Sequence, residues 1–173
     1  QIVFQKKSSS NNGFTCFVEN QQAMNADVAL MISHLDSTSN QTYHNFIKTS
    51  LTVEKNKFNH ICFNVKHRLG KREIDAYLNG EKQEVTLEGS GLDIVNIDFI
   101  NDSFIIGSGS NHIVDTGVTY ANNLTNALML TGALDDFRVF HSVRSLQDIK
   151  NEFNTNIFKR DDLKLYYKFN EPT

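Results

Sequence analysis

The sequence predicts a mainly β protein with one short helix near the C-terminus. Three observations lead to this prediction. Apolar and β-branched residues gather in short runs such as 14–18 and 26–33. Asn79-Gly80 is a strong hairpin signal, because both residues tolerate positive φ. After Phe140 the apolar period changes from two to the longer spacing of a helix. A chain of 173 residues is long enough to bury the core of one domain.

The predicted strands follow one another as a meander, separated by polar turns. In chain order they are 1–6, 14–18, 26–33, 48–53, 61–65, 73–78, 104–107, 137–141 and 163–172. The segments 89–91 and 108–126 are predicted as loops. The second is unusually long for a connection, which favours a functional role or high mobility.

The helix is predicted over 145–154. Leu146, Ile149 and Phe153 fall at i, i+3 and i+7, which gives one apolar stripe. Ser145 can cap the helix, and Asp148 three residues later favours its N-terminus.

Four motifs occur in a fixed order along the chain. They are Gly132-Ala-Leu-Asp-Asp-Phe-Arg-Val-Phe140 before a short capped helix, the aromatic-x-His-hydrophobic run 58–65, the Tyr-x-Asn-Gly turn 77–80 and the Ile-Gly strand 104–107. Together they resemble the laminin G-like jelly roll of the concanavalin A-like superfamily. The resemblance implies a two-sheet antiparallel jelly-roll sandwich, all-β apart from one short C-terminal helix.

The resemblance also implies a division of the chain. Residues 1–160 would form the sandwich without its opening strand, which would precede Gln1. Residues 161–173 resemble a strand that closes such a module or opens the next one, so we expect a segment of a longer, multi-module protein. The resemblance gives His60 a structural role in its strand.

Composition and charge argue against several classes of function. The net charge is −3 with acids and bases interspersed, and the basic run 66–72 is predicted to be a solvated turn rather than a nucleic-acid surface. No stretch is apolar enough to insert into a membrane. Cys16 and Cys62 lie in different strand-like runs, and free buried thiols are the preferred interpretation over a disulfide.

Catalysis is not predicted. Glu73-Ile74-Asp75 begins like the acidic strand motif of related sandwich hydrolases, but Tyr77 or Leu78 stands where the third acid is required. The retaining pair of carboxylates is therefore incomplete. The six histidines show no spacing typical of zinc ligands.

One structural calcium ion is an expectation from the resemblance. Asp135 matches the Asp that often helps hold calcium in related sandwiches, with other ligands from distant loops. Because calcium takes six to eight oxygen ligands, a single Asp is not enough. Hydrogen bonding of Asp135 to loop amides is the alternative.

A shallow glycan-binding surface is the main candidate site. Such sites combine an aromatic ring with Asp and Asn side chains, and two loops offer these residue types. The candidate residues are Asn111, His112, Asp115, Tyr120, Asn122 and Asn123 in the long loop, and Tyr43 and His44 in the other. Simple solvation of Asn-rich turns is the alternative.

The sequence thus predicts a non-catalytic recognition module of an extracellular, cell-surface or virion-surface protein. It would bind glycans or a protein partner through loops or a concave sheet face, without nucleic acid and without membrane insertion. Two alternatives are an architectural module that contacts neighbouring modules or subunits of a viral or phage structure, and an accessory domain of a glycosidase.

Overall fold

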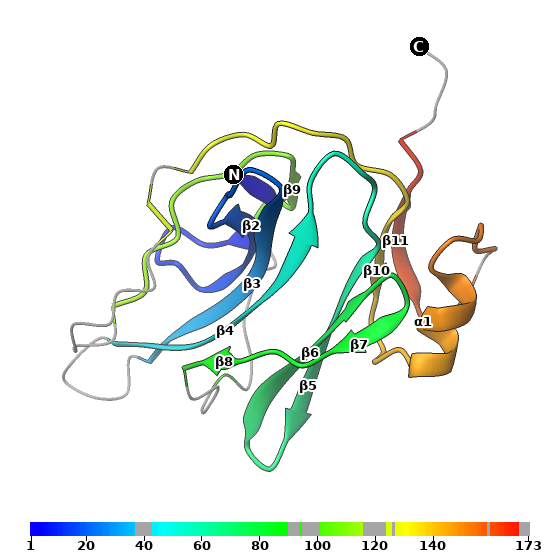
Figure 1. Cartoon of the computed structure of the whole chain (residues 1–173). Helices are drawn as coiled ribbons and strands as arrows, with labels where there is room; N and C mark the ends of the chain where they lie inside the picture. Colours follow the sequence, from blue (N-terminus) through cyan, green and yellow to red (C-terminus); the bar gives the residue numbers. More distant parts are fainter. Residues whose placement is uncertain are drawn as a thin grey trace.

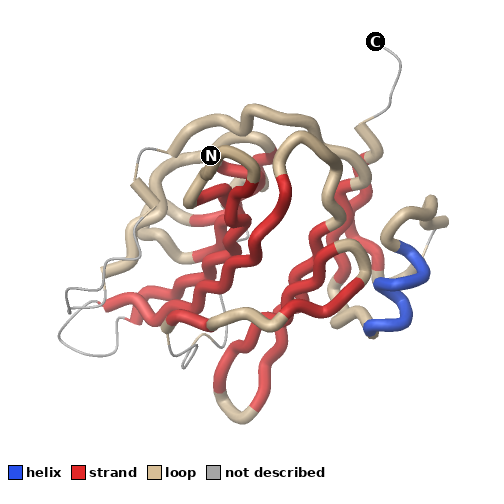
Figure 2. The backbone as a smooth tube through the Cα atoms, viewed as in Figure 1, coloured by secondary structure: helices blue, strands red, loops and turns tan. Residues whose placement is uncertain are grey.

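The computed structural model of the chain describes residues 1–36, 43–89, 94, 101–115, 124–125, 127–158 and 160–169. Within these residues strands dominate and a single helix occurs (Figure 2). The strands form an antiparallel six-stranded sheet, a three-stranded sheet and a two-stranded ribbon. This arrangement confirms the predicted all-β sandwich with one short C-terminal helix.

The six-stranded sheet has the strand order β8-β4-β3-β2-β1-β9 (Figure 1). Its strands are β1 Ile2–Lys7, β2 Gly13–Glu19, β3 Asn25–Asp36, β4 Tyr43–Glu54, β8 Leu87–Glu88 and β9 Ile105–Ile106. The central pair, β3 and β4, is in register over all twelve residues of each strand. The predicted strand 48–53 is therefore only the second half of β4.

The remaining strands form two smaller units. They are the three-stranded sheet of β5 Ile61–Arg68, β6 Lys71–Leu78 and β7 Glu81–Gln83, and the ribbon of β10 Phe137–Phe140 and β11 Leu163–Tyr167. Both hairpin turns have positive φ at their two central residues, 51° and 78° at Leu69-Gly70 and 51° and 83° at Asn79-Gly80. The second turn confirms the sequence signal.

The main core lies between the sheets and consists of alternate residues of the strands. Its buried members are Cys16, Ala26, Val28, Leu30, Ile32, Ile47, Leu51, Val53, Ile74, Ala76 and Ile94. At one end of this core Phe104 contacts the rings of Phe4, Phe14 and Phe137, with centroids 5.7 to 6.1 Å apart. These aromatic contacts connect β10 to the large sheet.

A second, smaller core covers the opposite face of the six-stranded sheet. It contains Phe17, Ala29, Met31, Phe46 and Val114, with Leu124 packed against it. In the segment 111–115, part of the predicted long loop, residues 112 and 114 are buried while 111, 113 and 115 are exposed. This alternation holds the segment against the sheet, so its odd-numbered residues face solvent.

The helix α1 spans Leu146–Glu152 and begins as predicted. The Ser145 hydroxyl accepts from the Asp148 amide at 3.1 Å, and the Asp148 carboxylate accepts from the Ser145 amide. Ile149 is buried and Phe153 packs against the backbone of Gly80. Leu146 is 42% exposed, so the predicted stripe is wrong at this residue: the packed side of this seven-residue helix is formed by Ile149 and Phe153.

Arg144 joins the ribbon to the rest of the fold. Its guanidinium is 2.6 Å from the Glu152 carboxylate and 2.9 Å from that of Asp162, and it lies over the Phe140 ring. The side-chain amide of Asn64 on β5 donates to the Arg144 carbonyl at 2.8 Å and accepts from its amide. β11 is therefore held through a buried charge as well as through its pairing with β10.

Both cysteines are free thiols, as predicted. Cys16 is buried in the main core, and burial raises the pKa of its thiol. Cys62 is half-buried, and burial raises the pKa of its thiol to about 11. At neutral pH both therefore stay in the unreactive protonated form.

Candidate functional site

Two of the predicted ligand segments meet at one end of the six-stranded sheet. The His44 amide donates to the Asp115 carbonyl at 2.6 Å, and the Asp115 amide donates to His44 Nδ1 at 3.1 Å. His44 Nε2 then donates to the Ser10 carbonyl at 2.9 Å. Three segments far apart in the sequence thus form one surface, which we call the polar rim: Ser8, Ser10, Asn12, His44 and Asp115.

The turn 8–12 gives the rim its hydroxyl and amide groups. The Ser8 and Ser10 hydroxyls are 2.9 Å apart, and the Asn12 side-chain amide donates to Ser10 at 3.3 Å. Asn12 also accepts from the Leu35 amide, which fixes the turn to the end of β3. Ser10 and Asp115 are exposed. The rim therefore exposes the Ser10 hydroxyl and the Asp115 carboxylate on a backbone that is held by internal hydrogen bonds.

Both ring nitrogens of His44 are engaged inside the protein, so His44 orders the rim rather than offering a free nitrogen to a ligand. Asn111 is exposed, and its side-chain oxygen Oδ1 accepts from the Ala127 amide at 2.9 Å. The side chain of Tyr43 and the residues Tyr120, Asn122 and Asn123 lie outside the described part of the structure.

His112 corrects the prediction of a ligand-binding side chain, because it is completely buried. The Asn11 carbonyl can only accept, so the Ser33 hydroxyl donates to it at 2.5 Å. The ring Nε2–H then donates to Ser33 at 2.7 Å, and Nδ1 accepts from Thr15 at 2.8 Å. Burial, aided by the charge of Lys7, lowers the pKa of His112 to about 4. His112 is thus a neutral anchor beneath the rim.

The described surroundings of Asp135 supply few oxygen ligands for the expected calcium ion. Asp135 is exposed, and one of its oxygens accepts from the Asp136 amide at 2.9 Å. The Asp136 carboxylate is occupied by Arg138 at 3.1 Å and by the Tyr166 hydroxyl at 2.7 Å. Among the described residues, no group of three His, Cys, Asp or Glu side chains could hold a metal. The expected calcium ion therefore gains no support here.

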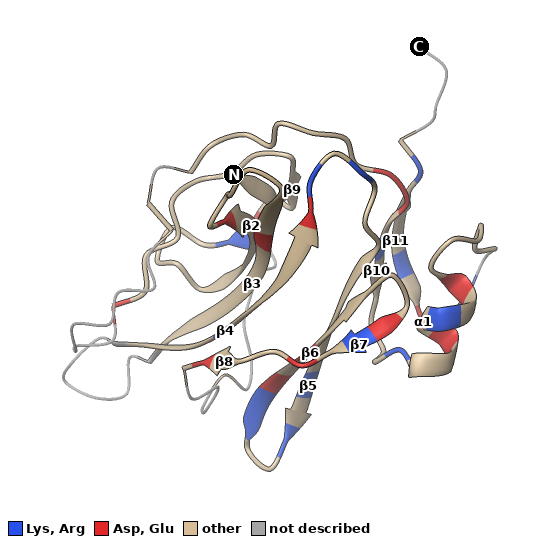
Figure 3. Cartoon of the chain, viewed as in Figure 1, with Lys and Arg blue, Asp and Glu red and all other residues tan. Residues whose placement is uncertain are grey.

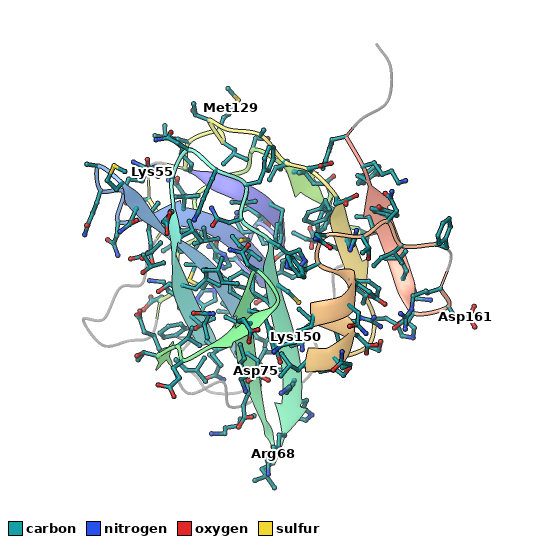
Figure 4. The ribbon with its side chains drawn as sticks, turned by 45° about the vertical axis from the view of Figure 1, so that its right-hand side comes forward. Lys55, Arg68, Asp75, Met129, Lys150 and Asp161 are labelled. Carbon is teal, nitrogen blue, oxygen red and sulfur yellow. The ribbon has the colours of Figure 1, made fainter. Side chains whose placement is uncertain are left out.

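The acidic strand β6 carries no free pair of carboxylates. Asp75, labelled in Figure 4, lies between Lys66 and Lys82, the second at 3.1 Å. Partial burial opposes ionisation of Asp75, but hydrogen bonds from the two lysines hold its pKa below the usual range. Glu73 is 3.8 Å from Lys71. Each acid is balanced by a base, as in an ordinary solvated sheet face.

Charges are interspersed over the hairpin of β5 and β6 and over β7 (Figure 3). Residues 67–70 at the hairpin tip are exposed, which agrees with a solvated turn. Among the described residues, no helix is long and apolar enough to cross a membrane.

His60 lies within the fold, on the chain entering β5. Its amide donates to the Asn79 side chain at 2.9 Å, and its ring packs edge-on against Phe153. Burial, then the charge of Arg138, lowers the pKa of the imidazole. The backbone of His60 is thus tied to the hairpin turn at Asn79, and its ring packs on the residue that follows α1.

The sequence prediction missed an apolar groove of about 320 Å³. It is lined by Phe104, Ile106, Leu165, Tyr167 and Phe169. Tyr167 and Phe169 are 46% and 45% exposed, and their rings are 6.0 Å apart. The alternation Leu163, Leu165, Tyr167 was a usable signal for one apolar face, but its opposing wall comes from β9, some sixty residues earlier.

Comparison with protein-family models matches residues 1–150 to Laminin_G_3, described as the concanavalin A-like lectin/glucanases superfamily. Comparisons with curated proteins and with solved structures gave no match. The matched residues include the ten described strands before β11 and the first five of the seven residues of α1. The chain therefore belongs to the Laminin_G_3 family of the concanavalin A-like lectin/glucanase superfamily.

Proposed function

We propose that this chain is a non-catalytic recognition module that binds glycans through the polar rim. The family consists of lectin-like and glucanase-like sandwiches, which makes carbohydrate or protein binding the expected class of function. The observation that carries the proposal is the meeting of turn 8–12, His44 and Asp115 at one exposed edge. His44 and Asp115 were predicted as ligand residues, whereas turn 8–12 was not.

Three of the rim residues have a definite role in this proposal. The Asp115 carboxylate accepts hydrogen bonds from sugar hydroxyls, and the Ser10 hydroxyl both donates and accepts. His44 is a positioning residue, since its ring holds turn 8–12 against the backbone of Asp115. Pre-ordering by these internal hydrogen bonds lowers the entropic cost of binding.

An extracellular, cell-surface or virion-surface location fits this role, because complex glycans are displayed there. The balanced acids of β6 favour binding without hydrolysis. An architectural module in contact with neighbouring subunits, or an accessory domain of a glycosidase, would use the same sandwich without needing an ordered polar rim.

A glycan array tests the proposal. Wild type is compared with Asp115→Asn and Ser10→Ala, with His67→Ala and Asp161→Asn as controls, because both control residues are exposed and lie outside the rim. We expect about tenfold weaker binding in each rim variant, since loss of one hydrogen bond to a charged group has an effect of that size. Equal loss in the control variants, or glycan hydrolysis by wild type, would contradict the proposal.

A further inference from the structure

The apolar groove is lined by side chains from two edge strands. β9 is the last strand of the six-stranded sheet, and β11 is one of the two strands of the ribbon. Figure 1 shows β11 beside β10. Among the described strands, β11 pairs with β10 alone, so one row of its backbone amides and carbonyls is available for pairing.

The two faces of β11 differ in chemistry. Leu165 and Tyr167 face the groove, while Lys164, Tyr166 and Lys168 alternate with them on the other face. The Lys164 ammonium donates only to a backbone carbonyl, and that of Lys168 lies 5.6 Å from the Tyr166 ring centre. Neither lysine has a carboxylate partner among the described residues.

We propose that the groove binds an extended segment of a partner protein, in which apolar and acidic residues alternate, as an added strand on the free edge of β11. The apolar side chains of that segment would fill the groove beside Leu165 and Tyr167. Its acidic side chains, on the opposite face, would lie next to Lys164 and Lys168. Side chains alternate between the two faces on both strands. The apolar contacts in the groove and the contacts between acids and lysines therefore occur in the same register.

A second copy of this chain fits the edge less well. In the antiparallel register that pairs all five residues of β11, Lys164 faces Tyr166 of the copy and Lys168 faces Asp162 of the copy. The Asp162 carboxylate already accepts from Arg144 at 2.9 Å and from Ser142 at 2.8 Å. A copy therefore supplies no free acid to the two lysines, whereas an acidic segment does.

This site lies apart from the polar rim, so its test is independent of the proposed glycan binding. The probe is a capped heptapeptide of alternating valine and glutamate, compared with a peptide of the same composition in which valines and glutamates stand in blocks. Fluorescence anisotropy measures both affinities. We expect the alternating peptide to bind at least about tenfold more tightly. Equal binding of the two, or no binding of either, would overturn the proposal.

Charge reversal tests the lysines. Lys164→Glu with Lys168→Glu should weaken binding of the valine–glutamate peptide about tenfold and should allow a valine–lysine peptide to bind instead. The matched control is Lys57→Glu with Lys71→Glu, which changes the net charge equally at exposed sites paired with Glu54 and Glu73. The same loss in both double variants would mean attraction by net charge alone and would overturn the proposed site.

Hydrogen bonding between the peptide backbone and β11 is tested separately. Two further peptides carry N-methyl groups, one on every valine and one on every glutamate, so that each blocks one edge of the added strand. We expect one of them to lose binding and the other to retain it, because alternate amides point to opposite edges. Retention by both peptides, or loss by both, would overturn the assignment of a β-strand partner.

Discussion

The polar rim and the apolar groove depend on buried polar anchors of opposite kinds. Beneath the rim, the neutral His112 is held by the hydroxyls of Thr15 and Ser33. At the start of β11, whose later residues line the groove, the charged Arg144 is held by the carboxylates of Glu152 and Asp162. The stabilisation from a buried neutral histidine is lost when its ring gains a proton. The stabilisation from a buried arginine is lost when its carboxylate partners become protonated and lose their charge. The two surfaces should therefore respond differently to acid and to mutation.

Mild acid should loosen the rim first, and this is the largest expected effect. The pKa of His112 is about 4 in the fold and 6.5 ordinarily, so its contribution is complete above pH 6.5 and is lost as pH falls towards 4. The difference corresponds to roughly 3 kcal/mol. Urea unfolding between pH 7 and pH 4 measures it, and His112→Gln should flatten that dependence.

The ion pairs of Arg144 with Glu152 and Asp162 should persist to lower pH than the neutral form of His112. The Ser142 hydrogen bond and the charges of Arg144 and Arg160 outweigh desolvation and hold the pKa of Asp162 below its usual 3.8. The stability from this ionised form is complete above that value and is lost only as pH falls through the lower folded pKa. Amide hydrogen exchange at pH 5 should thus show 111–115 opening before 163–167. Opening of both segments together would contradict the comparison.

Arg144→Met should disturb the groove and spare the rim. The variant leaves Glu152 and Asp162 without their buried partner, and we expect about 2 kcal/mol lower stability. The loss is below that of a fully buried pair because the two acids are 21% and 23% exposed. Thermal unfolding measures the loss, and glycan binding should remain at the wild-type level. Loss of glycan binding with peptide binding in the groove retained would contradict the assignment of Arg144 to the groove region.

Asn64→Leu should have a smaller effect on the same region. The Asn64 amide satisfies both the amide and the carbonyl of Arg144, and leucine leaves these buried groups unpaired. We expect about 1.5 kcal/mol lower stability. Asn59→Leu is the matched control, because the Asn59 side chain donates only to the backbone carbonyls of the exposed residues Glu54 and Lys57. Similar losses in both variants would show that the contact with Arg144 is unimportant.

The smallest effect on stability is expected for Tyr167→Ser with Phe169→Ser. Both rings are nearly half exposed, so the loss should stay under about 1 kcal/mol. Peptide binding in the groove should nevertheless be lost. Phe158→Ser, at an 85% exposed ring outside the groove, is the control and should keep peptide binding. Unfolding of the double variant at room temperature would mean that the rings belong to the core.

Local signals predicted much of this fold, because they act within a few residues. Asn79-Gly80 requires a hairpin whatever surrounds it, and Ser145 with Asp148 caps the helix through contacts three residues apart. The exposure of Leu146 was not predictable in this way, since it depends on which sheet edge the helix meets.

Long-range contacts explain what the sequence did not predict. His112 resembled a loop residue, and its burial depends on Thr15 and Ser33, which are 97 and 79 residues away. The groove likewise forms only when the fold brings Ile106 of β9 near Leu165 and Tyr167 of β11. Asp115 and His44 were predicted separately as ligand residues, and only the folded chain places them in one surface.

The measurement that most directly tests glycan recognition by the rim is an amide NMR titration of the whole chain with the strongest-binding array glycan. We predict shifts at Ser10, His44 and Asp115, with little change at Ile106, Leu165 or Tyr167. Shifts concentrated at the groove residues, or the failure of every array glycan to bind, would contradict the account.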